Sequence, residues 1–254
     1  MTDAATPMRG LVARARQWEP AAIGRLLSLI DNSPERWPGI QAELGQAASA
    51  PATRVIGITG PPGAGKSTLL DKLLENLVGR GLRVAVIAVD PSSPFSGGAV
   101  LGDRTRLGAV AHDPHVFIRS VASRGANGGL AESTGKMLEL LKALGFPVVI
   151  VESVGAGQSE VAIAHLTGYR VVLCPPGLGD DVQALKAGIL EIADILVVSK
   201  GDLPGSETTE REMRSAMGLR RGRRQPAVLR VSAATGMGVA ELADSMLERP
   251  GGGG

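Results

Sequence analysis

Residues 54–70, RVIGITGPPGAGKSTLL, combine a short β-branched run, a glycine-rich turn and the start of a helix. Gly60, Gly65, Lys66 and Ser67 fit the pattern G-x-x-x-x-G-K-[ST] of a phosphate-binding loop. Glycines let the backbone approach a phosphate closely, and the N–H groups at the helix start direct positive partial charge at it. We therefore expect the consecutive loop residues to bind a nucleotide: Gly60, Pro61, Pro62, Gly63, Ala64, Gly65, Lys66, Ser67 and Thr68.

The chain alternates apolar, β-branched runs with helical patterns after residue 54. Alternation of this kind is typical of an α/β fold with a mostly parallel sheet and helices on both faces, here a P-loop NTPase fold. We expect a helical extension over residues 1–50, a nucleotide-binding domain over 51–249 and a glycine-rich tail over 250–254. The predicted strands are 55–59, 84–89, 148–151, 171–174, 195–198 and 228–231, and the predicted helices are 66–79, 130–144, 181–192, 207–217 and 239–247.

Composition excludes several classes of protein. The chain has 254 residues, 44% of them hydrophobic but only 2% aromatic, so stacking platforms for nucleic-acid bases are scarce. A net charge of +2 does not indicate a polyanion partner, and the basic run at 220–224 is either a solvated loop or a docking patch. With a single cysteine, Cys174, and neither a membrane span nor a secretion signal, we expect a cytoplasmic protein.

Acidic residues follow two of the predicted strands, and ligands bind at the carboxyl ends of such strands. Asp90 follows the second strand and Asp103 lies in the Pro/Ser/Gly-rich stretch after it, so both are candidate Mg²⁺ ligands together with Ser67. Glu152 ends the next strand, where a carboxylate can hold the metal shell or orient the attacking water. Gly155 follows, and its backbone N–H can contact a γ-phosphate.

The segment CPPGLGDDVQ, residues 174–183, follows another strand end. Gln183 and Lys186 are three positions apart on a predicted helix and face the same way, with Asp180 near the helix start. From the residues alone, this region is either functional or an ordinary strand-to-helix turn with a solvated helix.

Two later strand ends carry residues suited to guanine. Asp202 can accept hydrogen bonds from guanine N1 and the 2-amino group, which adenine does not offer, and Lys200 can lie along the base. Ser232, Ala233 and Ala234 close the last strand, where a backbone N–H can meet guanine O6. The order of these segments after a phosphate-binding loop favours GTP over ATP.

Four segments, GPPGAGKST, AVDPSSPFSGGAVLGDRTR, VESVGAGQSEVAIAH and SKGD, resemble in this order the MeaB/ArgK family of P-loop GTPases. The resemblance covers about residues 11–247 and implies a GTP- and Mg²⁺-dependent chaperone. Such a chaperone gates the loading and protection of the cofactor of an adenosylcobalamin-dependent acyl-CoA mutase, with methylmalonyl-CoA mutase as the expected client. It also implies that Asp103 and Glu152 serve the metal and that Asp180, Gln183 and Lys186 are catalytic residues of a switch.

The sequence departs from the family pattern in two places. Ser199 stands where the family usually has asparagine, so we expect guanine selectivity with weaker affinity. The family's C-terminal dimerisation arm has no counterpart after Arg249, so a homodimer is possible but would lack that arm. Two alternatives remain open at this point: a nucleotide-gated adaptor without important turnover, and an ATP-using P-loop kinase or ATPase.

Overall fold

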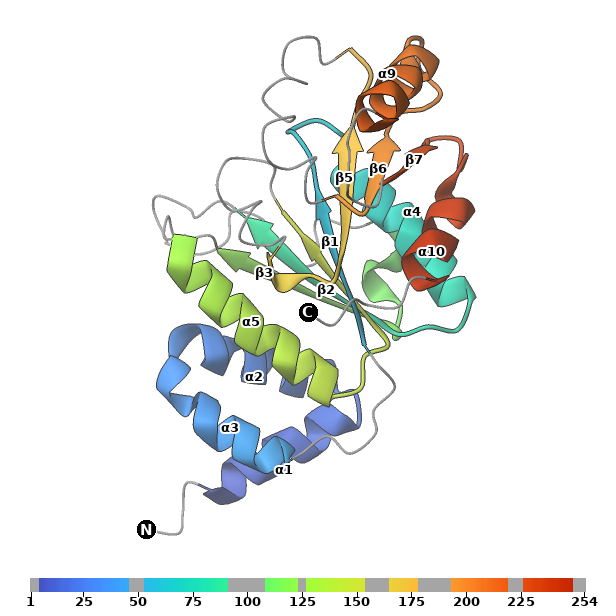
Figure 1. The fold of residues 1–254 in the computed structure, drawn as a ribbon. Helices are drawn as coiled ribbons and strands as arrows, with labels where there is room; N and C mark the ends of the chain where they lie inside the picture. Colours follow the sequence, from blue (N-terminus) through green and yellow to red (C-terminus); the bar gives the residue numbers. More distant parts are fainter. Residues whose placement is uncertain are drawn as a thin grey trace.

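The computed structural model describes residues 5–45, 53–90, 108–122, 127–153, 165–177, 193–218 and 226–248. Within these ranges one seven-stranded sheet forms the centre of the molecule, in the order β3-β2-β4-β1-β5-β6-β7 (Figure 1). Every strand pairing is parallel, which confirms the predicted fold class. The strands are β1 (Arg54–Thr59), β2 (Val84–Asp90), β3 (Val116–Ala122), β4 (Val148–Glu152), β5 (Tyr169–Cys174), β6 (Ile195–Val198) and β7 (Ala227–Arg230).

Strand β3, at one edge of the sheet, is missing from the sequence prediction. Its sequence, VFIRSVA, is interrupted by Arg119, and its first four residues are only half-buried. The Arg119 guanidinium leaves the sheet and donates to Ser28 Oγ of helix α2 (Pro20–Asn32) at 3.0 Å. An edge strand need not be uniformly apolar, because one of its sides has no neighbouring strand to cover it.

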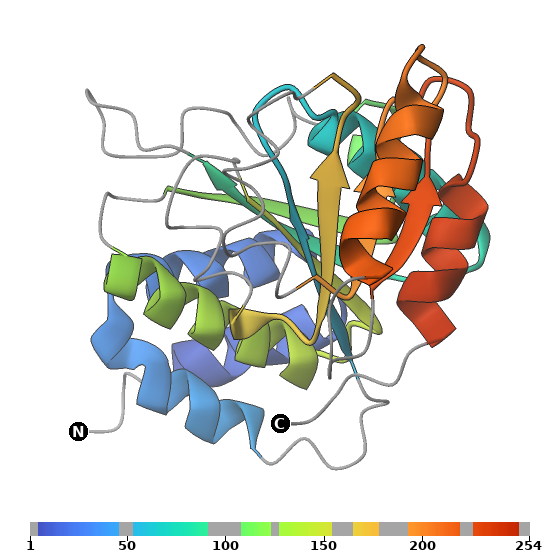
Figure 2. The same cartoon turned by 45° about the horizontal axis from the view of Figure 1, so that its top comes forward.

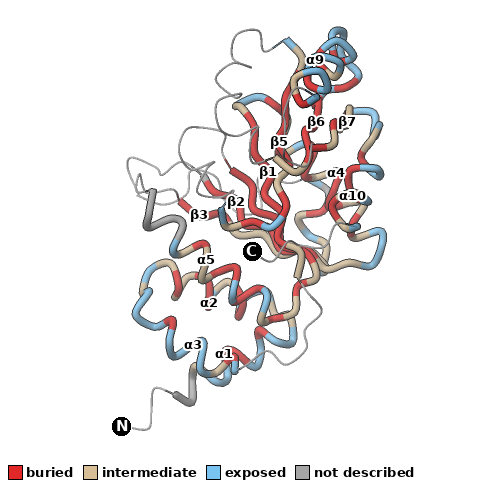
Figure 3. The backbone as a smooth tube through the Cα atoms, in the orientation of Figure 1, coloured by how far each residue is buried: buried red, intermediate tan, exposed pale blue. Residues whose placement is uncertain are grey.

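Helices cover both faces of the sheet, and the buried residues follow the strands between them (Figure 3). Leucines of α4 (Lys66–Gly79) pack with α10 (Val239–Glu248) on one face, as the 3.6-residue period of their apolar positions requires. The opposite face carries α5 (Asn127–Ala143) over β1, β2 and β4, and α9 (Ser206–Gly218) over β5, β6 and β7. The predicted helix 181–192 lies outside the described residues.

The N-terminal helices share a core with α5. They are α1 (Ala5–Arg16), α2 and α3 (Trp37–Leu44), and Figure 2 shows them gathered beside α5, away from α9 and α10. A 3₁₀ turn, Pro34–Arg36, leads into α3. Trp18, between α1 and α2, packs edge-to-face on Phe146 with ring centroids 4.4 Å apart. Among the described residues, no helix combines the length and apolar character needed to cross a membrane.

Candidate functional site

The carboxyl ends of the strands bring together the segments that the sequence separates. β1 runs at the middle of the sheet between β4 and β5, and the phosphate-binding loop begins directly after it. The register pairs Ile58 of β1 with Glu152 of β4, so Glu152 lies beside the start of this loop. The loops after β6 and β7 lie at the same edge of the sheet, because all of these strands are parallel.

The phosphate-binding loop needs glycine at specific positions. Gly60, Gly63 and Gly65 have φ angles of +149°, +74° and +84°, which residues with a side chain rarely adopt. At Gly60 a Cβ would also lie 2.7 Å from the carbonyl oxygen of Leu173 on the neighbouring strand β5. The sequence motif therefore reflects both the backbone conformation of the loop and its tight packing on the sheet.

Lys66 is the first residue of α4 and is only 8% exposed. Its Nζ donates to the carbonyl oxygens of Gly60, at 2.7 Å, and Pro61, at 3.0 Å. The ammonium thus lies against the backbone of the loop that its own helix follows. A bound phosphate would meet this charge together with the N–H groups at the start of α4.

Ser67 and Glu152, which are 85 residues apart, meet at the end of the loop. Ser67 Oγ donates to Glu152 Oε1 at 2.7 Å, and Glu152 is 1% exposed. Ser153 braces this position, because its N–H donates to Ile58 O at 3.0 Å and its hydroxyl to Thr59 Oγ1 at 2.8 Å. A hydroxyl and a carboxylate in contact form a hard oxygen donor pair of the kind that Mg²⁺ prefers, so these residues fit the ion.

A cavity of about 310 Å³ opens beside the loop, between the start of α4 and the turns that follow β6 and β7. Its lining is mostly apolar, and aliphatic surfaces of this kind can hold the faces of a flat heterocycle. Leu69 and Leu203 also belong to this lining, and they were not singled out from the sequence. Leu203 is one of the exposed large hydrophobic residues in the described part of the chain, but this exposure is visible only in the structure. Seven other lining residues were expected to bind nucleotide: Ala64, Gly65, Thr68, Lys200, Asp202, Ala233 and Ala234.

Asp202 is the carboxylate of this cavity, and Ser232 orients it. Ser232 Oγ donates to Asp202 Oδ1 at 2.6 Å and itself accepts from the Thr235 N–H at 3.2 Å. The Ser232 hydrogen bond, followed by a backbone hydrogen bond at Asp202, lowers the pKa of the Asp202 carboxyl and keeps it ionised. Lys200, two residues before it, also lines the cavity and has a positive φ of 53°.

Ser199 lines the same cavity and is 4% exposed. Its N–H donates to Cys174 O at 3.2 Å, while its hydroxyl is buried without a hydrogen-bond partner in the part of the chain that the structure describes. Cys174 ends β5, and burial raises the pKa of its thiol to about 12, so the thiol stays protonated. Neither residue adds a charge to the cavity.

The remaining predicted site residues lie at the end of a described segment or outside the described residues. Asp90 ends β2, and its side chain is not described. Asp103, Gly155, Asp180, Gln183 and Lys186 lie outside the described residues. The described part of the site therefore joins the phosphate-binding loop, the Ser67–Glu152 pair and the Asp202 cavity along one edge of the sheet.

Known proteins are similar to this chain in sequence and in fold. A model of the family described as "Methylmalonyl Co-A mutase-associated GTPase MeaB" matches residues 23–249. A protein of Pyrococcus horikoshii named as a GTPase is 43% identical over 95% of this chain and 77% of its own length. The GTPase ArgK of Escherichia coli is 38% identical over 93% of this chain and 74% of its own. The resemblance to the MeaB/ArgK family is thereby confirmed.

A solved structure shares the arrangement of the elements. The crystal structure described as "LAO/AO transport system kinase" superposes with a TM-score of 0.76 and is 30% identical in sequence. It covers 98% of this chain and 76% of its own, so the similarity extends over the N-terminal helices as well as the sheet.

Proposed function

This chain belongs to the MeaB family of P-loop GTPases, and we propose that it uses GTP to gate the loading and protection of the cofactor of an adenosylcobalamin-dependent acyl-CoA mutase. Hydrolysis of GTP is the family's activity, and the family description names methylmalonyl-CoA mutase as the associated protein. Methylmalonyl-CoA mutase is accordingly the client we propose. The observation that carries the nucleotide part is the Ser232-oriented carboxylate of Asp202, in a cavity next to the phosphate-binding loop.

Guanine recognition follows from the chemistry of the cavity. Asp202 would accept hydrogen bonds from guanine N1–H and the 2-amino group, and adenine has no matching donors at those positions. Lys200 would cover one side of the base, and the N–H groups of Ala233 and Ala234 would face guanine O6. Support comes from the placement of all four residues in the cavity lining.

Phosphate binding would use the residues at the start of α4. Lys66 would exchange its contacts with Gly60 O and Pro61 O for the β- and γ-phosphates. The loop residues 63–68 would present backbone N–H groups to the same phosphates, whereas Pro61 and Pro62 have no N–H and would only shape the loop. Ser67 and Glu152 would hold Mg²⁺, with Asp90 and Asp103 as further candidates, and the ion would neutralise charge on the phosphates. As an alternative to holding the metal shell, Glu152 would orient the attacking water.

A partner would complete the catalytic groups. Asp180, Gln183 and Lys186 lie outside the described residues, and we propose that mutase binding brings Lys186 to the phosphates and that Gly155 contacts the γ-phosphate. A cation supplied in this way can accelerate GTP hydrolysis by roughly 10³–10⁵-fold. The isolated protein should therefore turn over slowly.

The experiment is GTP hydrolysis by the purified protein, with ATP as the nucleotide control, in the presence and absence of methylmalonyl-CoA mutase. We expect slow, GTP-selective turnover that the mutase stimulates. Lys186→Ala should abolish the stimulation, whereas Lys142→Ala, at an exposed position near the end of α5, should retain it. Stimulation that survives Lys186→Ala overturns the role of Lys186, and turnover indifferent to the mutase overturns the choice of client.

A non-hydrolysable GTP analogue separates gating by turnover from gating by binding. If gating requires GTP hydrolysis, the analogue should support mutase binding but not repeated delivery of adenosylcobalamin. Full delivery with the analogue would show that bound nucleotide alone controls the partner, as in a nucleotide-gated adaptor. Preferential hydrolysis of ATP would contradict the guanine assignment itself.

A further inference from the structure

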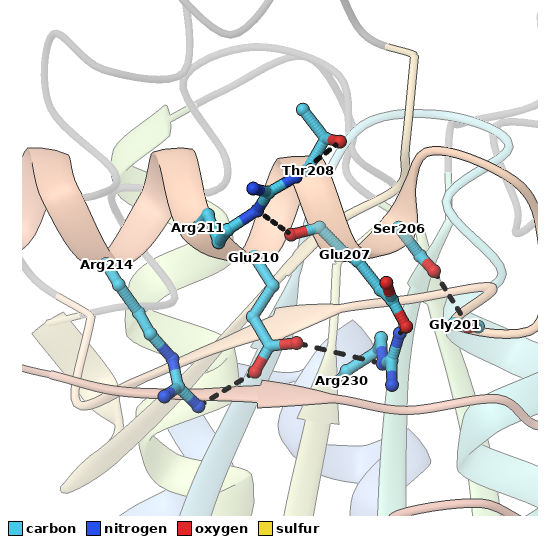
Figure 4. A network of polar contacts seen from close by, with 8 residues as sticks. All are labelled: Gly201, Ser206, Glu207, Thr208, Glu210, Arg211, Arg214 and Arg230. Carbon is cyan, nitrogen blue, oxygen red and sulfur yellow. Dashed lines mark hydrogen bonds and ion pairs between the residues drawn. The ribbon is translucent and has the colours of Figure 1, made fainter.

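A cluster of ion pairs joins helix α9 to strand β7 (Figure 4), close to the Asp202 cavity. Arg230 is the last residue of β7, and its Nη1 lies 2.8 Å from Glu207 Oε1. Its Nε lies 3.7 Å from Glu210 Oε2. Both carboxylates belong to the beginning of α9, so a single guanidinium connects the strand with the helix.

The side chain of Arg230 passes directly over Gly201. A Cβ at position 201 would lie only 2.7 Å from Arg230 Cγ, so glycine is what allows this approach. The Gly201 N–H donates to Val231 O at 2.9 Å, and Gly201 O accepts from Ser206 Oγ at 2.8 Å. Gly201 is therefore held between the end of β7 and the start of α9, and the next residue is Asp202.

We propose that Arg230 is a positioning residue for guanine recognition, which fixes the turn at Gly201 and thereby aims the Asp202 carboxylate at the base. The inference rests on the proposed reading of guanine by Asp202. Arg230 is not among the residues that line the cavity, so it acts through the turn and through α9 rather than by touching nucleotide.

Solvent limits the size of the effect. The Glu207 side chain is 78% exposed, whereas those of Arg230 and Glu210 are 28% and 21% exposed. Exposed ion pairs contribute little, and partly buried pairs contribute somewhat more. Because the coupling cannot exceed the contribution of the pairs themselves, we expect a change of about two- to fivefold in base discrimination.

The readout is the ratio of the affinities for GTP and ITP. Hypoxanthine, the base of ITP, lacks the 2-amino group, so the ratio reports how well Asp202 accepts that one hydrogen bond. A hydrogen bond to a charged group should make the wild-type ratio about ten- to a hundredfold. General destabilisation of the fold lowers both affinities together and leaves their ratio unchanged.

Arg230→Gln keeps most of the side-chain stem and removes the charge, and Arg230→Lys restores a charge. The matched control is Arg214→Gln, because Arg214 donates to the same Glu210 at 2.8 Å and to Val228 O at 3.2 Å. Competition against a fluorescent guanine nucleotide should show a GTP:ITP ratio that falls about two- to fivefold in Arg230→Gln. The ratio should be partly restored in Arg230→Lys and unchanged in Arg214→Gln.

Two results would overturn the inference. One is an unchanged ratio in Arg230→Gln, and the other is an equal fall in Arg214→Gln, which would mean that any loosening of α9 suffices. Equal binding of GTP and ITP by the wild-type protein would instead remove the Asp202 assignment on which the inference rests. The mutase proposal is judged separately, by stimulated turnover.

Discussion

Replacing Asp202 with asparagine tests the base assignment most directly. The carboxylate already accepts one hydrogen bond from Ser232 at 2.6 Å, and its remaining lone pairs can accept from guanine N1–H and the 2-amino group. In Asp202→Asn, an amide NH₂ replaces one of the two oxygens. A donor then faces the guanine 2-amino donor, and the bond to N1–H becomes neutral.

The expected loss follows from these two changes. A hydrogen bond to a charged group contributes about 1.5–3 kcal/mol, so losing the bond to the 2-amino group removes that amount. Converting the N1 bond from charged to neutral costs about 1 kcal/mol more. The sum, about 2.5–4 kcal/mol, corresponds to roughly a seventyfold to thousandfold weakening of GTP binding. ATP binding, which does not use this carboxylate, should change little.

The substitution that weakens GTP binding should strengthen the binding of xanthine nucleotides. Xanthine has a carbonyl where guanine has the 2-amino group, so the new amide can donate to it while its oxygen accepts from N1–H. Competition titrations with GTP, ATP and XTP should show a preference for GTP in the wild type and for XTP in Asp202→Asn. The control is Asp244→Asn in α10, which removes a carboxylate paired with Arg80 and should leave all three affinities unchanged. A variant at position 202 that binds GTP within threefold of wild type and gains no XTP affinity would refute the assignment.

Three further outcomes are expected. Ser67→Ala should abolish the Mg²⁺-dependent part of GTP affinity and leave GTP binding in excess chelator nearly unchanged. A Mg²⁺ titration of nucleotide binding measures both. Equal losses of affinity with and without Mg²⁺ would contradict a role of the Ser67 hydroxyl in holding the ion. Gly60→Ala should lower the free energy of unfolding by about 1–3 kcal/mol in urea titrations, because its Cβ would lie 2.7 Å from Leu173 O at a φ of +149°. The Arg230 hydrogen bond and charge lower the pKa of the Glu207 carboxyl below its ordinary value of 4.5, so the pair stabilises the fold above pH 4.5 and stops doing so as pH falls through the lowered pKa. The melting temperature of Glu207→Gln should consequently fall less than that of wild type on acidification, and parallel curves would show that the pair contributes nothing.

The phosphate-binding loop could be predicted from the sequence because its requirements are local. A backbone that turns with φ of +74° at Gly63 and +84° at Gly65 favours glycine, and Lys66 follows as the first residue of the next helix, where a phosphate-binding loop carries its cation. The alternation of apolar runs with helical patterns is local in the same sense, and it correctly indicated a parallel sheet. Asp202 was singled out because two strand ends suited to guanine follow a phosphate-binding loop in this order, although each segment alone is a weak signal.

The contacts that complete the site depend on strand order, which no local pattern encodes. Ser67 meets Glu152 because β4 pairs with β1, and Asp202 meets Ser232 because β7 lies next to β6. The sequence assigned Ser232 to the base through its backbone, whereas the structure shows its side chain orienting Asp202.

The sequence by itself determined the chemistry of this protein: a loop for phosphates, acidic residues at strand ends, and a family of GTPases. Tertiary structure alone decided which of these groups touch, because hydrogen bonds between strands join residues far apart in the chain. It also revealed the edge strand β3, whose apolar pattern is interrupted by Arg119, and the packing of the Arg230 side chain over Gly201. The physical reason is the same for Arg119 and Arg230. Each is a charged residue on a strand whose polar partners belong to a helix distant in the sequence, so the contact exists only once that helix has packed on the sheet.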